Sequence, residues 1–301
     1  MAKRAALITL NPTLDLLFEG EAYSFSRKVF ARHGEIAAGG SAINIARGLR
    51  DLGRCATVYT ILGGEVGELV HDRMADERLD FRYAECRAET RVTAIVTDGG
   101  SSRMFVAPSP PIEPEVVEQL ISRYYAEIAE RDLILIGGSI PSEAVRCVIS
   151  QLLCPLIRQG KKVIVDSRGQ FAQEAHANKP FAARYNSDQN CSQAGRRRRN
   201  SSRQTAYDLH MSGIQLVLYT TTRCCYAIHD GRVRRYPHLA PETAHVFGRG
   251  DALLAGLIAA LLDGSGFDDA IRLAAACRAS FDREFPLGTI NSLILGLPGR
   301  L

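Results

Sequence analysis

The stretch HVFGRGDALLAGLIAALL, His245 to Leu262, places two glycines around an arginine, then an aspartate, then eleven almost wholly apolar residues. A helix N-terminus presents unpaired N–H groups and the positive end of the helix dipole. Gly248 and Gly250 allow a tight turn and let a ligand approach without a Cβ in the way. The pattern predicts an anion-binding turn at the start of a helix, suited to a phosphate or its transition state.

Asp251 has two interpretations at this place. It is either the N-cap of a helix that starts at Ala252, or a general base that takes a hydroxyl proton beside a phosphate-transfer site. The stretch by itself leaves both open. The RGD tripeptide also invites interpretation as an adhesion signal, which we set aside because nothing in the sequence suggests secretion.

The rest of the chain alternates between strand and helix signals. Apolar strands are expected at 5–10, 55–62, 132–138, 161–167 and 215–219, and helices at 39–53, 65–77, 114–130, 142–160, 251–263 and 268–281. This alternation implies a mostly parallel sheet covered by helices on both faces. Two β-patterned runs on either side of residues 98–100 predict a hairpin that stands off the main sheet.

Composition sets limits on the class of protein. The 301 residues suffice for one large α/β domain or two modest ones, and the net charge of +4 is too weak to argue for nucleic acid. Four positive charges lie together at Arg196–Arg199, in the polar stretch 184–206; we favour a solvated loop or helix start there over a nucleic-acid or localisation signal.

No targeting or membrane signal stands out. The basic N-terminus leads into a strand rather than a signal peptide, and no run approaches the roughly 18 apolar residues of a membrane span. The eight cysteines have no zinc-binding spacing, and Cys224 and Cys225 are expected to be buried thiols in a strand. These features favour a cytoplasmic protein with reduced cysteines.

Six separated segments carry a family resemblance. They are NPTLD (11–15), GGSAINIARGL (39–49), ETR (89–91), GSIP (138–141), VDS (165–167) and GRGDALLAG (248–256). They occur in the order typical of the PfkB, or ribokinase-like, sugar kinases and resemble its phosphosugar branch. The resemblance implies a single ribokinase-like domain over 1–301, a three-layer α/β/α fold with a mostly parallel central sheet, and a small β-lid formed by about 12–37 and 83–108.

The resemblance also implies roles for individual residues. Asp251 matches the catalytic base, and the amides of Gly248, Arg249 and Gly250 match the anion hole for the migrating phosphoryl group. The matching sugar-binding positions are Asp15, Gly39, Gly40 and Asn44, and the cations expected to hold the phosphate of the substrate are Lys28, Arg91 and Arg103.

ATP and Mg²⁺ are the implied cofactors, and Asn186, Thr220 and Thr222 match nucleotide-binding positions. The nucleotide side departs from the family pattern more than the sugar side does. Gln189 replaces the glutamate associated with magnesium, so the metal ligands stay unassigned, and Thr222 and Cys225 replace glycines. The side chain of Arg249 could point outward, block the nucleotide or clamp a phosphate, and the sequence does not decide.

The resemblance predicts ATP-dependent phosphorylation of a phosphorylated hexose, in the manner of 1-phosphofructokinase. It also predicts a homodimer joined through the β-lid, with no nucleic acid or membrane as partner. Two alternatives stay open. One is a catalytically impaired relative that senses a phosphosugar, and the other is a kinase for an unphosphorylated sugar or a nucleoside.

Overall fold

The computed structural model describes residues 3–20, 28, 30–97, 102–167, 169–186, 199–221, 224–237, 247–280 and 290. Its strands are β1 (Arg4–Ile8), β2 (Thr13–Glu19), β3 (His33–Gly39), β4 (Cys55–Gly63), β5 (Asp80–Cys86), β6 (Arg91–Thr97), β7 (Ser102–Val106), β8 (Leu133–Gly137), β9 (Val163–Asp166), β10 (Ala182–Asn186), β11 (Leu216–Thr220), β12 (Cys224–His229) and β13 (Arg232–Pro237). Its helices are α1 (Ser41–Asp51), α2 (Gly64–Asp76), α3 (Pro114–Ala129), α4 (Glu143–Arg158), α5 (Gly169–Ala177), α7 (Arg199–Met211), α8 (Arg249–Leu262) and α9 (Phe267–Ser280).

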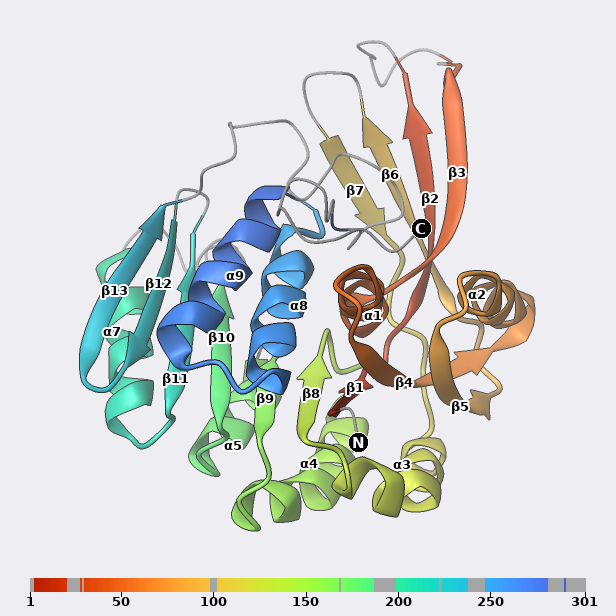
Figure 1. Cartoon of the computed structure of the whole chain (residues 1–301). Helices are drawn as coiled ribbons and strands as arrows, with labels where there is room; N and C mark the ends of the chain where they lie inside the picture. The colour runs from red at the N-terminus through yellow and green to blue at the C-terminus, as the bar shows by residue number, and fades with distance from the viewer. Residues whose placement is uncertain are drawn as a thin grey trace.

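The larger of the two sheets has the order β13-β12-β11-β10-β9-β8-β1-β4-β5 (Figure 1). From β5 to β11 along this order, every neighbouring pair of strands is parallel. The last two strands, β12 and β13, join as antiparallel neighbours at one edge. The mostly parallel α/β sheet expected from the alternating sequence is therefore confirmed.

Helices cover both faces of this sheet. In β1, Leu7 packs in one core cluster with α1, α8 and α9, and the next residue, Ile8, packs in a second cluster with α3 and α4. Met74 of α2 belongs to the first cluster and Phe171 of α5 to the second. The three layers of the expected α/β/α fold follow directly from this alternation.

Helix α8 lies inside the first helical layer, next to α1 and α9 (Figure 1). Every residue from Ala252 to Leu262 is buried, which explains why this helix is apolar on all sides. Because the helix cannot turn any part of its surface to water, its position in the layer is fixed. Its N-terminus is thereby held in one place relative to the strand ends.

The smaller sheet has the order β3-β2-β6-β7 and stands off the large sheet, at the top of Figure 1. In its register Asp15 lies opposite Ala37 on β3 and Thr93 on β6. Side chains alternate between the faces of a sheet, so Asp15 and Thr93 share one face and their immediate neighbours along the strands share the other. We call this sheet the lid and the face that carries Asp15 its inner face.

The lid is smaller than the sequence predicts. The expected second part, 83–108, includes residues of β5, but β5 pairs in parallel with β4, with Tyr83 opposite Thr60. Strand β4, helix α2 and strand β5 form a βαβ unit of the large sheet, and Tyr83 packs against its first core cluster. The second part of the lid therefore begins at Arg91, and the predicted β6–β7 hairpin is confirmed.

The polar stretch 184–206 contains more regular structure than its composition suggests. Its first residues complete β10, and Arg199 begins α7, whose Ala206 packs on the large sheet beside Val217. Arg196–Arg198 lie outside the described residues. Cys224 and Cys225 are buried in β12, as predicted. Within the described part of the chain, no helix has the length and apolarity of a membrane span.

Candidate active site

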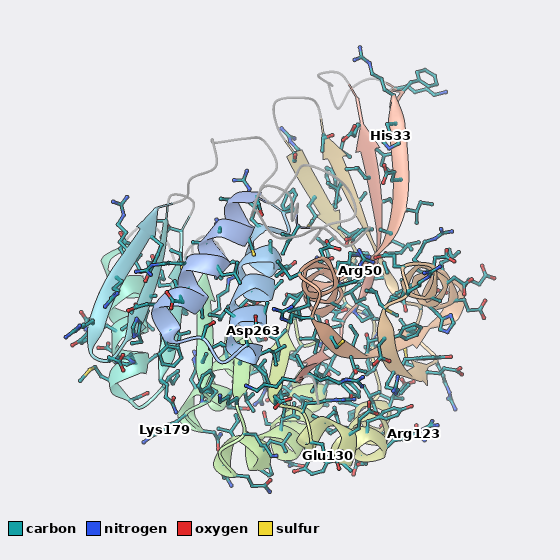
Figure 2. The ribbon with its side chains drawn as sticks, in the orientation of Figure 1. His33, Arg50, Arg123, Glu130, Lys179 and Asp263 are labelled. Carbon is teal, nitrogen blue, oxygen red and sulfur yellow. The ribbon has the colours of Figure 1, made fainter. Side chains whose placement is uncertain are left out.

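Polar side chains gather where the parallel strands of the large sheet end. Asp166 closes β9, Arg184 lies near the end of β10, and the N-termini of α1 and α8 reach the same edge. Carboxyl ends of parallel strands are where open α/β sheets bind ligands. Glu130 and Lys179 belong to the opposite side of the molecule, far from the lid residue His33 in Figure 2.

The turn before α8 has the geometry of an anion site. Gly248 is the N-cap, with φ of 81°, and its carbonyl accepts hydrogen bonds from the amides of Asp251 and Ala252, both at 3.0 Å. Arg249 and Gly250 are the first two residues of α8, so their amides belong to the N-terminal turn of the helix. The positive end of the helix dipole at this turn suits a phosphoryl oxygen.

The N-cap interpretation of Asp251 is wrong, because Gly248 occupies that position and no side chain caps the helix. The Asp251 carboxylate instead crosses to α1, where it accepts hydrogen bonds from Ser41 Oγ and Asn44 Nδ2, each at 2.8 Å. Burial raises its pKa to about 6, while the Asn44 hydrogen bond and the charge of Arg184 act in the opposite direction. The carboxyl is therefore held in place and poised to gain or lose a proton near neutral pH.

Arg184 lies against the glycine turn. A Cβ built on Gly250 would be 2.1 Å from Nη2 of Arg184, so a larger residue there would displace this guanidinium from the turn. Nη1 of Arg184 donates to both carboxylate oxygens of Asp166, at 2.9 and 3.1 Å. The guanidinium that covers the turn is thus supplied by β10, and it adds a positive charge beside the N-terminus of α8.

The inner face of the lid supplies a second carboxylate, Asp15. It is 3% exposed, its Oδ1 has no hydrogen-bond partner, and its Oδ2 would lie 2.2 Å from a Cβ on Gly39. Burial raises the pKa of Asp15 to about 7, while the positive charges of Arg47 and Arg91 lower it. An unpartnered buried oxygen beside bare backbone is suited to a ligand hydroxyl.

The ETR segment serves to position Arg91. Glu89 accepts the amide of Val66 at the start of α2, at 2.7 Å, and Thr90 Oγ accepts the amide of Gly63, at 3.0 Å. These bonds fix the first residue of β6, and Nη2 of Arg91 then donates to the carbonyl of Asn11, at 3.1 Å. Nε of Arg91 is buried without a partner and leaves one donor for a ligand.

Two predicted cations are not brought to this place within the chain. Arg103 pairs with Val96, whose position in the alternation lies on the outer face of the lid, and its side chain is exposed. Lys28 belongs to the connection between β2 and β3, beyond the end of the hairpin that carries Asp15, and its Nζ lies 4.7 Å above the ring of Phe30. Arg91 alone of the three lies beside Asp15.

Two other sugar-side predictions are placed at the start of α1. Gly40 is the N-cap of that helix. The amide of Asn44 bonds two other side chains: its nitrogen donates to Asp251, at 2.8 Å, and its oxygen accepts from Arg47, at 2.9 Å. Asn44, predicted to bind the sugar, is therefore bonded to the carboxylate of Asp251 on α8.

The nucleotide side is described only in part. Asn186 ends β10 opposite Thr220, the last residue of β11, whose hydroxyl is buried without a partner. Cys225 of β12 lies opposite Thr220. Its φ is not positive, so no glycine is needed at that position. Thr222 and Gln189 lie outside the described residues.

Sequence reasoning missed three contributors to the site: Ser41, Asp166 and Arg184. The available signal was position, since Asp166 and Arg184 are polar residues in the last three positions of buried strands and Ser41 follows a glycine pair. No metal site accompanies them: within the described ranges, no cluster of three or more histidine, cysteine, aspartate or glutamate side chains could hold an ion.

Comparisons with known proteins agree with this picture. A family model described as pfkB family carbohydrate kinase matches residues 11–280. A 1-phosphofructokinase of Haloferax volcanii is 27% identical over 240 residues, 78% of this chain and 76% of that protein. A 1-phosphofructokinase of Bacillus subtilis is 21% identical over 295 residues, 94% and 93% of the two chains. Among solved structures, Escherichia coli phosphofructokinase-2 in complex with substrates and products has a TM-score of 0.82 at 22% identity, with 92% of each chain covered.

Proposed function

This chain belongs to the pfkB family of carbohydrate kinases, phosphotransferases with an alcohol group as acceptor, and we propose that it phosphorylates a hydroxyl of a hexose phosphate with ATP. The observation that carries the proposal is the position of Asp251. Its carboxylate directly follows the glycine turn at the N-terminus of α8 and is held by Ser41 and Asn44 of α1. A base and an anion site are thereby adjacent.

In the proposed reaction Asp251 takes the proton of the attacking sugar hydroxyl. The sugar oxygen forms a bond to the γ-phosphorus as the bond from that phosphorus to the bridging oxygen breaks, and ADP leaves with the electron pair. With a pKa of about 6, Asp251 is mostly ionised at pH 7 and ready to accept the proton. Ser41 and Asn44 keep the carboxylate oriented during the transfer.

The transferring group requires positive charge around its oxygens. In this proposal the amides of Arg249 and Gly250 and the guanidinium of Arg184 provide it, which the nearness of Arg184 to the N-terminus of α8 supports. These donors are fixed before the reaction begins, because α8 is buried and Arg184 is paired with Asp166. Donors that need no rearrangement stabilise developing charge more effectively than water does.

Asp15 and Arg91 support a phosphorylated hexose as the acceptor. Asp15 offers an unpartnered oxygen to a sugar hydroxyl, and Arg91 offers a half-buried guanidinium to the phosphate. The names of the two 1-phosphofructokinases point to the same class of substrate. Arg103 and Lys28 stay proposals for the same phosphate, and neither lies beside Asp15 in this chain.

Magnesium belongs to the proposal as a companion of the nucleotide. Mg²⁺ neutralises phosphate charge and usually keeps several waters with one or two carboxylates. The described residues offer no ligand cluster for it, and Asp166 is already paired with Arg184. We therefore assign no step of the reaction to a metal held by this part of the protein.

The test is ADP formation with fructose 1-phosphate, fructose 6-phosphate, tagatose 6-phosphate and fructose, for the wild type and Arg91→Ala. We expect turnover of a hexose phosphate, with KM raised about ten-fold or more in Arg91→Ala and no such rise for fructose. Saturable binding of a hexose phosphate without ADP formation would favour a catalytically impaired relative that senses a phosphosugar. Preference for fructose over the hexose phosphates would favour a kinase for an unphosphorylated sugar.

We further propose that the lid joins two copies of this chain. Phe18, Ile36 and Phe105 are 41%, 54% and 51% exposed on the outer face of the lid, away from Asp15. A contiguous apolar face of this kind is costly in water and is typical of an interface. Ile36→Glu should convert a dimer to a monomer in sedimentation analysis, and a wild type that is monomeric at every concentration contradicts the proposal.

A further inference from the structure

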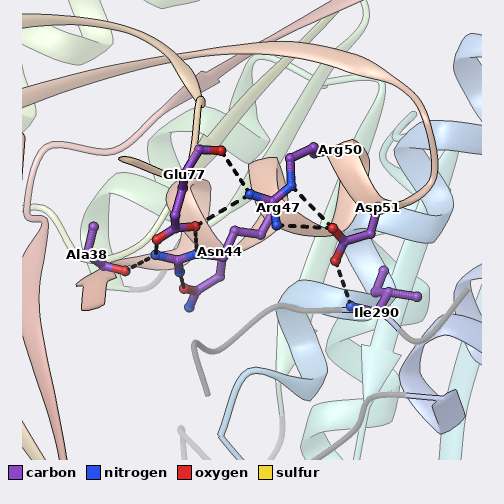
Figure 3. A network of polar contacts seen from close by, with 7 residues as sticks. All are labelled: Ala38, Asn44, Arg47, Arg50, Asp51, Glu77 and Ile290. Atoms are coloured by element: carbon purple, nitrogen blue, oxygen red, sulfur yellow. Dashed lines mark hydrogen bonds and ion pairs between the residues drawn. The ribbon is translucent and has the colours of Figure 1, made fainter. Parts of the chain in front are cut away.

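Arg47 takes part in a polar network that also includes Ala38, Asn44 and Glu77 (Figure 3). It is on α1, and its side chain is 0% exposed. Nε and Nη2 donate to the two carboxylate oxygens of Glu77, at 2.5 and 2.7 Å, and Nη2 also donates to the carbonyl of Ala38. Nη1 donates to Oδ1 of Asn44, at 2.9 Å.

The last of these bonds determines how the Asn44 amide is oriented. A guanidinium has donors only, so the side of the amide that faces Arg47 must be its oxygen. The amide nitrogen then faces Asp251 and donates to Oδ2, at 2.8 Å. The reversed amide would place a carbonyl against the carboxylate, where two acceptors repel each other.

We propose that Arg47 is a positioning residue for phosphoryl transfer, because it holds Asn44 as a donor to Asp251 and thereby fixes the general base. The inference rests on the proposed function of Asp251. Glu77, at the end of α2, fixes Arg47 through two hydrogen bonds, so the chain of contacts runs from Glu77 through Arg47 and Asn44 to Asp251.

The cost of burying a charge supports a role beyond packing. A fully buried guanidinium must be paired and hydrogen-bonded, and an apolar side chain of similar size often serves stability as well or better. Arg47 also lowers the pKa of the nearby Asp15 by its charge. One buried cation thus acts on both carboxylates of the site.

Other charges around Asp251 set the background against which Arg47 acts. Arg184 on β10 lowers the pKa of Asp251, and Asp166 on β9 raises it. Asp15 lies close enough on the lid for Asp251 to raise its pKa. None of these three touches the Asn44 amide in the hydrogen bonds described, so the Arg47 effect is separable by mutation.

Arg50 provides a matched control on the same helix. It donates to Asp51, at 3.1 and 3.3 Å, and to the carbonyl of Glu77, at 3.0 Å (Figure 3). Its described contacts do not include Asn44. Arg47→Lys and Arg50→Lys both keep the charge, but only the first removes the planar donor set that orients the amide.

The experiment compares kcat and KM across pH for Arg47→Lys, Arg50→Lys, Asn44→Ala and the double variant Arg47→Lys/Asn44→Ala. We expect Arg47→Lys to lower kcat about ten-fold and to leave KM for the sugar within about two-fold. The acid limb of the kcat profile, where kcat falls as the pH is lowered, should move to higher pH by about one unit because the pKa of Asp251 rises. Arg50→Lys should change none of these. In the Asn44→Ala background, Arg47→Lys should add little, because both changes break the same contact.

A second readout does not depend on turnover. The free energy of unfolding is measured from pH 4 to 8 for each chain and for its Asp251→Asn derivative. The difference between the two changes with pH, and the midpoint of this change reports the pKa of Asp251. The midpoint should move upward in Arg47→Lys and not in Arg50→Lys. If the wild type turns over no hexose phosphate, the proposed function fails while this measurement still decides the role of Arg47.

A purely structural role predicts a different pattern. Arg47→Lys would then lower the melting temperature with an unchanged acid limb and midpoint, and its effect on kcat would add fully to that of Asn44→Ala. Either result overturns the proposal. If Arg47→Lys does not fold, Glu77→Gln, which keeps Arg47 and weakens its anchor, should shift the acid limb in the same direction by a smaller amount; an unshifted limb would count against the proposal.

Discussion

The two buried carboxylates of the site lie in different surroundings. Asp251, on the α8 side, accepts two hydrogen bonds from α1, whereas Asp15, on the lid side, has an oxygen that no donor reaches. Burial raises the pKa of both, to about 6 and about 7. The pre-oriented carboxylate suits a base that must act in one geometry, and the unpartnered one suits a group completed by its ligand.

The difference follows from the elements that carry each residue. Asp251 is in the first turn of a helix whose position is fixed by burial on all sides, and α1 meets it with a serine and an asparagine. Asp15 is on the small lid sheet, one strand away from glycine backbone at Gly39. A carboxylate held rigidly, such as Asp251, is the arrangement expected for a catalytic group, and a carboxylate with an unpartnered oxygen, such as Asp15, is the arrangement expected for a group that binds substrate.

The largest expected effect is on the α8 side. Asp251→Asn removes the proposed proton acceptor and keeps the size of the side chain, so kcat should fall by about 10²–10⁴-fold. Binding of the hexose phosphate, measured by calorimetry, should stay within a few-fold of the wild type. A fall in kcat of less than ten-fold would mean that Asp251 is not the base.

The next effect concerns the lid side. A Cβ on Gly39 would lie 2.2 Å from Asp15, so Gly39→Ala must displace that carboxylate, and we expect KM for the sugar to rise about ten-fold with a smaller change in kcat. Gly34→Ala on the same strand is the control, since its nearest contact would be 3.6 Å away. Equal kinetics for the two variants would exclude Asp15 from sugar binding.

The sequence predicts the backbone of this arrangement better than its contacts. The βα alternation predicts a mostly parallel sheet, and the family resemblance carried by the motif order assigns Asp15, Arg91 and Asp251 to one site. Neither predicts that Asn44 bonds the α8 carboxylate or that Arg184 covers Gly250, because these contacts join residues 207 and 66 positions apart in the chain. Such pairs depend on the rotation of each element in the finished layer.

The lid shows the same limit. The alternating patterns of β6 and β7 predict a hairpin, but the face on which Arg103 lies follows only from its pairing with Val96 and from the pairing of β6 with β2. The boundary at 83 is wrong because a strand pattern does not say which sheet the strand joins, and β5 joins β4. Register and sheet membership are tertiary properties.

A smaller effect tests the α1 donors of Asp251 directly. Ser41→Ala removes one of its two hydrogen bonds, so kcat should fall roughly three- to ten-fold and the acid limb should move to higher pH. Ser142→Ala is the control: Ser142 caps α4, accepts the amide of Val145 at 3.2 Å, and should lower stability without moving the limb. A limb that is unchanged in Ser41→Ala would show that this bond does not hold the base.

The smallest effect is on stability. Burial raises the pKa of Asp251 from 3.8 to about 6, so the folded chain holds this proton more tightly than the unfolded chain does. Folding therefore loses stability as pH rises from about 4 to about 6, and the whole cost is present above that range and absent below it. Asp251→Asn carries no charge to bury, and its melting temperature should exceed that of the wild type by about 2–4 °C at pH 7.5, with the difference vanishing toward pH 4.

Calorimetric melts across this pH range measure the difference, with Asp76→Asn as the control because that carboxylate is 68% exposed on α2 and its ion-pair partner, Arg73, keeps its charge throughout. The control should give a difference that is nearly constant with pH. A difference for Asp251→Asn that is equally flat would show that the carboxylate is not buried at a cost. Asp251 would then resemble a surface acid, and its contrast with Asp15 would rest on hydrogen bonding alone.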